Sequence, residues 1–218
     1  MSTLADLVEH NQIEQLIINL EKGDVDVNER NIRGETALWR SCYHNRIQVF
    51  NLLMQHINIQ TLLMDSYGNT PFSAACYTGN FEIVHIMLKD GRNDVCVVNR
   101  WGWTPLMQAC LKGKYNVVQI LLAFDRRLDV DVQSQSDVSF LSPMIKKGLN
   151  AAQIANESGK EDVVSLLKQY QSDHVKTREL CWNQLRLKGL TKQEIFILAA
   201  ADGDIPKLIK MMGKRRRK

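Results

Sequence analysis

The chain has 218 residues, of which 44% are hydrophobic and 24% charged, as is usual for a soluble globular protein. No stretch approaches the roughly 18 uncharged apolar residues that a membrane span needs. Asp6 and Glu9 interrupt the apolar start of the chain, which does not fit a secretory signal peptide. We therefore expect an intracellular protein, cytoplasmic or nuclear, or one exported by a route without such a signal.

The net charge of +4 is concentrated in the last five residues, Lys214, Arg215, Arg216, Arg217 and Lys218. Without them, 23 of the 28 basic residues remain against 24 acidic ones, a net charge of −1. A globally basic surface for nucleic acid is therefore not indicated.

Three residue types recur every 34 residues, which is the signature of a solenoid built from repeated units. They are the glycines Gly34, Gly68 and Gly102, the threonines Thr36, Thr70 and Thr104, and the cysteines Cys42, Cys76 and Cys110. In the second half of each unit, apolar residues recur every three or four positions, as on one face of a helix. The sequence predicts stacked helix pairs.

The repeated segments resemble the ankyrin repeat, whose pattern is G-x-T-P-L-H-x-A-A. The three copies run from Gly34 to Cys42, from Gly68 to Cys76 and from Gly102 to Cys110. The usual histidine of the pattern is replaced by Trp39, Ser73 and Met107. The resemblance implies an all-α ankyrin-repeat solenoid of helix-turn-helix units with short turn or hairpin tips.

In chain order, this resemblance predicts a capping repeat over 4–31 and repeats near 32–65, 66–99, 100–133 and 146–170, which together form a stack over 1–170. The weaker fourth copy starts at Gly148, 46 residues after Gly102, so we expect an insertion over about 125–147. It is either a functional loop or a tolerated insertion that packs on its own repeat.

Three segments follow the predicted stack. A connecting helix is expected over 171–190, with Trp182 and Leu185 on its buried side. Residues 191–212 resemble a terminal ankyrin helix pair, and 213–218 form the basic tail. The tail is typical of a nuclear-import or polyanion-contact patch, or is a solvated end that aids solubility. Its contact with an anionic membrane would be weak without an acyl anchor.

The cysteines occupy a small packed position of the repeat, so we expect Cys42, Cys76 and Cys110 to be buried and unreactive. An odd number of cysteines without a CxxC pair disfavours a disulfide framework or a structural zinc site. No HExxH, Walker, GxGxxG or GxSxG motif occurs. Spacing alone leaves open a dyad of Cys76 with His44 or His85, but the repeat explains the cysteine. We expect neither catalysis nor a cofactor.

In the ankyrin family, partners bind at the turn tips and on the concave face of the first helices. The corresponding positions here are Arg33, Glu35, Tyr67, Asn69, Trp101 and Trp103 at the tips, and Tyr43, His44, Tyr77, Leu111 and Lys112 at the helix ends. Exposed aromatic residues near Arg or Lys are typical of interaction hot spots. Alternatively, Trp101 or Trp103 packs between adjacent turns, and Trp39 is expected to point inward.

The resemblance implies a monomeric protein-interaction module that acts as an adaptor, inhibitor or scaffold for one or more proteins. Ankyrin proteins occur in eukaryotic cells and among effectors of intracellular bacteria, which a bacterium secretes into a host. The alternative is a nuclear regulatory factor whose tail contacts nucleic acid or the import machinery while the repeats recruit a protein.

Overall fold

The computed structural model describes residues 3–23, 25–124, 128–136 and 146–187, and within them it contains eleven helices and no strand. The helices are α1 (Leu4–Glu9), α2 (Ile13–Lys22), α3 (Ala37–Tyr43), α4 (Ile47–Met54), α5 (Pro71–Thr78), α6 (Phe81–Asp90), α7 (Pro105–Leu111), α8 (Tyr115–Phe124), α9 (Ala151–Glu157), α10 (Glu161–Ser172) and α11 (His174–Leu187).

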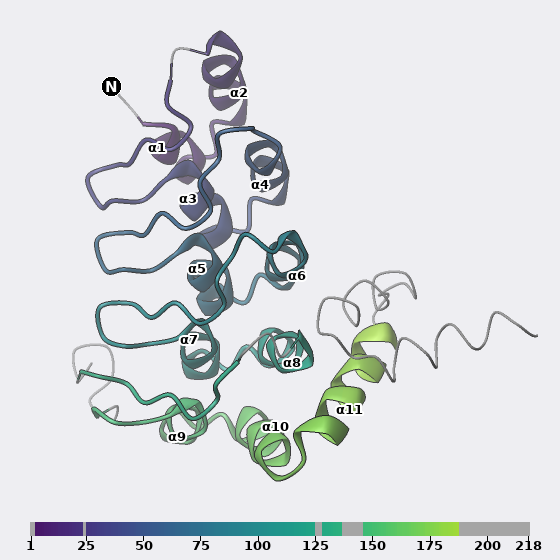
Figure 1. Ribbon diagram of the computed structural model, residues 1–218. Helices are drawn as coiled ribbons and strands as arrows, with labels where there is room; N and C mark the ends of the chain where they lie inside the picture. The colour runs from purple at the N-terminus through teal and green to yellow at the C-terminus, as the bar shows by residue number, and fades with distance from the viewer. Residues whose placement is uncertain (1–2, 24, 125–127, 137–145, 188–218) are drawn as a thin grey trace, which may run out of the picture.

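The helices α1 to α10 stand in two columns (Figure 1). The odd-numbered helices, which we call the first helices, form the column next to the hairpins, and the even-numbered second helices form the other column. None of the helices in the described part of the chain is long and apolar enough to cross a membrane.

The start of each central first helix is fixed by a threonine. The hydroxyl oxygens of Thr36, Thr70 and Thr104 accept the backbone N–H three residues later, at 3.1 to 3.2 Å. Pro71 and Pro105 occupy the next position, where the missing N–H has no helical partner to lose. The repeated Gly-x-Thr segment therefore encodes a hairpin end followed by a helix start.

Packing between repeats runs mainly through the first helices, each of which contacts the next along the column from α1 to α9. Leu38, Phe72 and Leu106 occupy equivalent positions in this column and are at most 1% exposed. Burying such a side chain stabilises the fold by about 1.5–3 kcal/mol. The predicted burial of Cys42, Cys76 and Cys110 is confirmed, because all three are 0% exposed.

The hairpin tips share one hydrogen-bond pattern. The residue that begins a tip donates its N–H to the carbonyl of the residue that ends it, in the pairs Asn31 and Glu35, Asp65 and Asn69, Asn99 and Trp103, and Ser134 and Leu149. In the first three tips the glycine is three residues after the first member of the pair, whereas Gly148 is fourteen residues after Ser134. Eleven extra residues therefore enter the chain at the last tip, within the predicted 125–147 insertion.

The far end of the described stack has a polar surface. Every exposed residue of α9 and α10 is polar or charged, as expected for a terminal repeat. Helix α11 packs on α8 and α10, with the ring centroids of Trp182 and Phe124 5.7 Å apart. Trp182 and Leu185 are buried as predicted. The predicted helix pair 191–212 and the tail 213–218 lie outside the described residues.

Candidate interaction surface

A row of aromatic rings on two successive repeats ends at a lysine of the third. Trp39 and Tyr43 lie one turn apart on α3, with their ring centroids 5.1 Å apart and their planes at 12°. Tyr43 stacks in turn on Tyr77 of α5, at 6.5 Å and 17°. The ammonium of Lys112, which follows α7, lies 4.7 Å from the centroid of the Tyr77 ring. We call these four residues the aromatic ladder.

The repeat register explains why Tyr43 and Tyr77 face outward, whereas Trp39 is 6% exposed and points inward as predicted. Tyr43, Tyr77 and Leu111 each follow a fully buried cysteine, and one step along a helix turns the side chain by about 100°. Tyr43 is 37% exposed, and Tyr77 and Leu111 are half-buried. These positions can therefore carry aromatic residues without disturbing the packed cysteines beneath them.

A second aromatic pair lies at the hairpin tips. The rings of Tyr67 and Trp101 stack at 5.5 Å and 22°. The Asp65 carboxylate accepts the backbone N–H groups of Tyr67 and Asn69 at 2.8 Å, and the Asn99 side chain does the same for its own tip. These side-chain caps hold both tips in a defined shape.

The ladder and the tip pair are joined through Asn69. The indole N–H of Trp39 donates to the backbone carbonyl of Asn69 at 3.1 Å. The side-chain oxygen of Asn69 accepts from Asn99 and Gln108 at 3.0 and 3.1 Å. Asn69 was predicted as a contact residue, and the structure shows it half-buried and hydrogen-bonded to side chains of the repeats on both sides. It positions the surface and offers little for a partner to contact.

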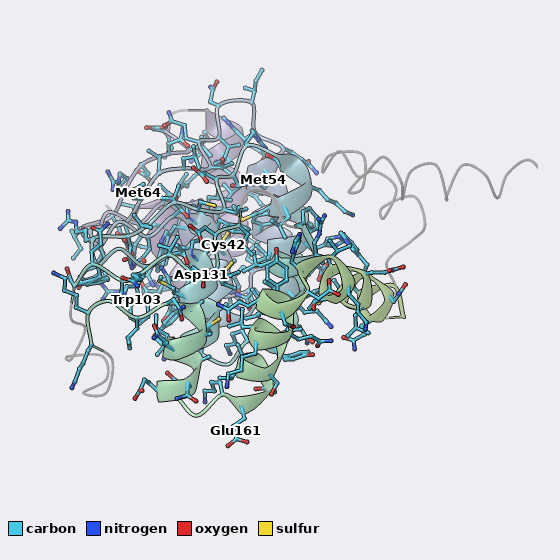
Figure 2. The ribbon with its side chains drawn as sticks, turned by 60° about the horizontal axis from the view of Figure 1, so that its bottom comes forward. Cys42, Met54, Met64, Trp103, Asp131 and Glu161 are labelled. Carbon is cyan, nitrogen blue, oxygen red and sulfur yellow. The ribbon has the colours of Figure 1, made fainter. Side chains whose placement is uncertain are left out.

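The prediction that Glu35 and Trp103 are exposed at the tips is wrong. Glu35 is 7% exposed and Trp103 is 2% exposed, and Trp103 belongs to the hydrophobic core. Figure 2, in which the α9–α10 end is turned toward the viewer, labels Trp103 on the hairpin side and Cys42 in the interior. The physical reason is that the residue after the tip glycine closes the hairpin by accepting its backbone hydrogen bond. Its side chain then continues under the tip toward the helices.

A buried ion cluster surrounds Arg40 on α3. Its guanidinium lies 2.8 Å from Glu35 and 2.9 Å from Glu9 of the first repeat, and its side chain is 4% exposed. Arg40 also lies 3.2 Å from the Nε2 atom of His44. Because Arg donates only, this nitrogen must be the unprotonated acceptor. Burial, followed by the charge of Arg40, lowers the pKa of His44.

The cysteines lie in an apolar interior. Burial raises the pKa of the Cys42, Cys76 and Cys110 thiols and raises that of Cys181 to about 11. A neutral buried thiol is a poor nucleophile. In the described part of the chain, no group of three or more His, Cys, Asp or Glu side chains is placed to hold a metal ion.

The remaining predicted residues lie at the surface. Arg33, Tyr67 and Lys112 are exposed, and His44, Trp101 and Leu111 are partly buried. Three exposed cations of the tips were not predicted as contact residues, namely Arg100, Lys146 and Lys147. Lys147 directly precedes Gly148, just as Arg33, Tyr67 and Trp101 precede the other tip glycines. This shared position is the sequence signal that could have identified it. The predicted tail contacts of Lys214–Lys218 lie outside the described residues.

Comparison with known proteins agrees with this architecture. A family model for ankyrin repeats matches in three overlapping copies, at residues 4–99, 60–135 and 91–178. No curated protein matches the chain. Ankyrin repeats generally mediate protein–protein interactions and are typically not enzymes.

Proposed function

Because the chain belongs to the ankyrin repeat family, we propose that it is an adaptor, inhibitor or scaffold that holds a protein partner against its tips and first helices. The proposal is based on the aromatic ladder. Trp and Tyr are enriched among the residues that dominate the binding energy of protein interfaces, and here three of them form a row on α3 and α5 that ends at Lys112.

The stacking within the ladder supports a binding role. Tyr43 and Tyr77 retain exposed surface, yet each ring is held by its neighbours. Little side-chain freedom is then lost when a partner covers them, which favours affinity. The proposal therefore places the energetic centre of the interface on α3 and α5.

The test uses the full chain as bait to capture a partner, which is then titrated against defined variants. The double variant Tyr43→Ala/Tyr77→Ala should weaken binding at least roughly thirtyfold, the loss typical of a true hot spot. Leu52→Ala is the matched control, because Leu52 is also 37% exposed but lies on the second helix α4. Equal affinity of the double variant and the wild type would refute the proposal, provided that both melt cooperatively.

A second candidate function rests on the basic run Lys214–Lys218. In this proposal the protein is a nuclear regulatory factor whose tail contacts import machinery or nucleic acid while the repeats recruit a protein. Deleting Gly213–Lys218 should then shift the protein toward the cytoplasm of eukaryotic cells without changing its melting temperature. If the tail binds nucleic acid, that affinity must also fall steeply with salt. An unchanged cellular distribution and salt-insensitive binding would remove this candidate.

A further inference from the structure

The hairpin tips form a row with a distinct order of side chains. The residues immediately before the four tip glycines are Arg33, Tyr67, Trp101 and Lys147. Two aromatic residues thus stand between two cations, and we call these four residues the tip row.

The charges of the tips have one sign. The residues that precede the tip row are Ile32, Ser66, Arg100 and Lys146, so the eight positions hold four cations and no carboxylate. The carboxylates of the neighbouring Glu35 and Asp65 are buried and are occupied by Arg40 and by backbone N–H groups. Arg33 lies 4.0 Å from Glu9 but keeps a 60% exposed side chain. The exposed edge therefore carries four cations, whereas the rest of the chain before the basic tail has 19 basic and 24 acidic residues.

The row is rigid because each tip is bonded to the next. Backbone N–H groups of Ser66, Arg100 and Gln135 donate to the carbonyls of Arg33, Tyr67 and Trp101, at 2.9, 3.0 and 2.9 Å. The first three members of the row therefore each accept a hydrogen bond from the tip that follows. A pre-organised surface loses little conformational entropy on binding.

The two aromatic residues at the centre of the row form an apolar contact site. Tyr67 is 55% exposed, and its ring is held against Trp101, which is half-buried. Such a supported aromatic pair is the usual anchor point of a protein interface. The cations on either side would complement acidic residues of a partner that flank the side chain bound on the Tyr67–Trp101 pair.

We propose that the tip row binds an extended, acidic segment of the partner protein, with one large apolar side chain of that segment on the Tyr67–Trp101 pair. This inference rests on the proposed function and names the chemistry of the partner. Neighbouring helices pack about 8–10 Å apart, so the row from Arg33 to Lys147 spans roughly 25–30 Å. An extended segment rises about 3.3 Å per residue, and about nine residues therefore cover it.

A protein segment fits the row better than nucleic acid does. A backbone-tracking nucleic-acid site neutralises on the order of 6–10 phosphates, whereas the tips provide four cations. The stacked Tyr67–Trp101 pair also has one ring face of each residue covered by the other. An acidic protein segment with one large apolar side chain needs only a few cations and one apolar contact site, which the four cations and the Tyr67–Trp101 pair provide.

To test the inference, peptides that bind the full chain are selected from a random library whose members have about 12 residues. The selected peptides should carry Asp and Glu on both sides of one aromatic or large aliphatic residue. Tyr67→Ala/Trp101→Ala should weaken them at least roughly thirtyfold, and Arg100→Gln/Lys147→Gln about tenfold at low salt. Lys168→Gln/Lys176→Gln is the matched control, because both lysines are exposed away from the tips on α10 and α11, and it should bind as the wild type does.

Four results would overturn the inference. They are selection of neutral or basic peptides, no selection at all, full binding by the tip variants, and displacement of the peptides from the tips by an oligothymidylate. If the selected peptides lose affinity only with Tyr43→Ala/Tyr77→Ala, the inference falls while the proposed function stands. If the captured protein partner is also insensitive to Tyr43→Ala/Tyr77→Ala, the proposed function falls as well.

Discussion

At the scale of single residues, the third hairpin shows why a surface cannot be predicted from position alone. Trp101 and Trp103 flank the same glycine, and the sequence analysis treated both as tip residues. The structure leaves Trp101 partly exposed on Tyr67 and buries Trp103 in the core. The register identifies the tip, but the hairpin hydrogen bond decides which flank points toward the helices.

These two tryptophans should respond differently to substitution. Trp103→Ala removes a 2% exposed side chain and should lower the free energy of unfolding by about 3–5 kcal/mol. Trp101→Ala removes mainly a stacked pair and should cost about 0.5–1.5 kcal/mol. Urea denaturation of both variants checks this, with Leu106→Ala as a core reference at about 2–5 kcal/mol. Equal losses for the two tryptophans would contradict the assignment.

His44 should make the first repeats sensitive to acid. Its pKa is lowered in the folded state, so the unfolded chain binds a proton first. Stability is then fully present above the ordinary histidine pKa and falls as the pH drops through the folded value. Protonation also removes the acceptor for Arg40 and places two cations 3.2 Å apart.

The check is the melting temperature of the wild type and of His44→Gln between about pH 7 and pH 5. The glutamine has no proton to take up, so the variant should lose less stability on acidification. His56→Gln serves as the control in the same repeat. A wild type and a His44→Gln variant with parallel pH profiles would show that His44 does not contribute.

At the scale of elements, the sequence predicted the regular repeats well because their caps and turns are local. The Gly-x-Thr segments identify the hairpin ends and helix starts of α3, α5 and α7, and apolar residues that recur every three or four positions identify the second helices. The packing of α11 on α8 and α10 could not be predicted. It depends on long-range contacts such as Trp182 with Phe124 and Gln119 with Gln184, which leave no periodic signal.

The candidate surface was only partly predictable for the same reason. Tyr43, Tyr77, Tyr67 and Lys112 were found because the framework around them repeats. The stacking of Trp39 on Tyr43 and the burial of Glu35 by Arg40 were not found, since both depend on side chains that are particular to this chain.

The turns between paired helices offer a test at this scale. Gly79, Gly113 and Gly159 have positive φ there, and Asn45 adopts φ 56° at the equivalent position. A left-handed residue with a Cβ costs about 1–2 kcal/mol, which asparagine partly offsets through local hydrogen bonds. Asn45→Ala should therefore lower the free energy of unfolding by about 1 kcal/mol, and Asn45→Gly should leave it unchanged or raise it.

Chemical denaturation of both Asn45 variants measures these changes. Gln48→Ala, at an exposed position of α4, is the control because alanine is favoured within a helix. If the Asn45→Ala variant has the same free energy of unfolding as the wild type, the turn must relax to another conformation.

At the scale of the whole molecule, the residues that pack the repeats together are largely separate from those proposed to bind a partner. The buried side chains of the first helices, which include Trp39 of the ladder, hold the repeats together, whereas Tyr43, Tyr77 and the tip row keep exposed surface. Stability of such arrays comes from contacts between neighbouring repeats. Substitutions of Tyr43, Tyr77 and the tip row should therefore change binding more than folding, whereas substitutions of buried residues such as Trp39 should change both.

The most direct test of this account is site-specific photo-cross-linking in the cell. A photoreactive phenylalanine analogue replaces Tyr77 on the ladder, Tyr67 on the tip row, or Ile57 in the turn after α4, where the side chain is 93% exposed. We expect one protein partner to be cross-linked from positions 67 and 77 and not from position 57. Cross-linking of that partner from position 57 alone, or equally from all three positions, would contradict it.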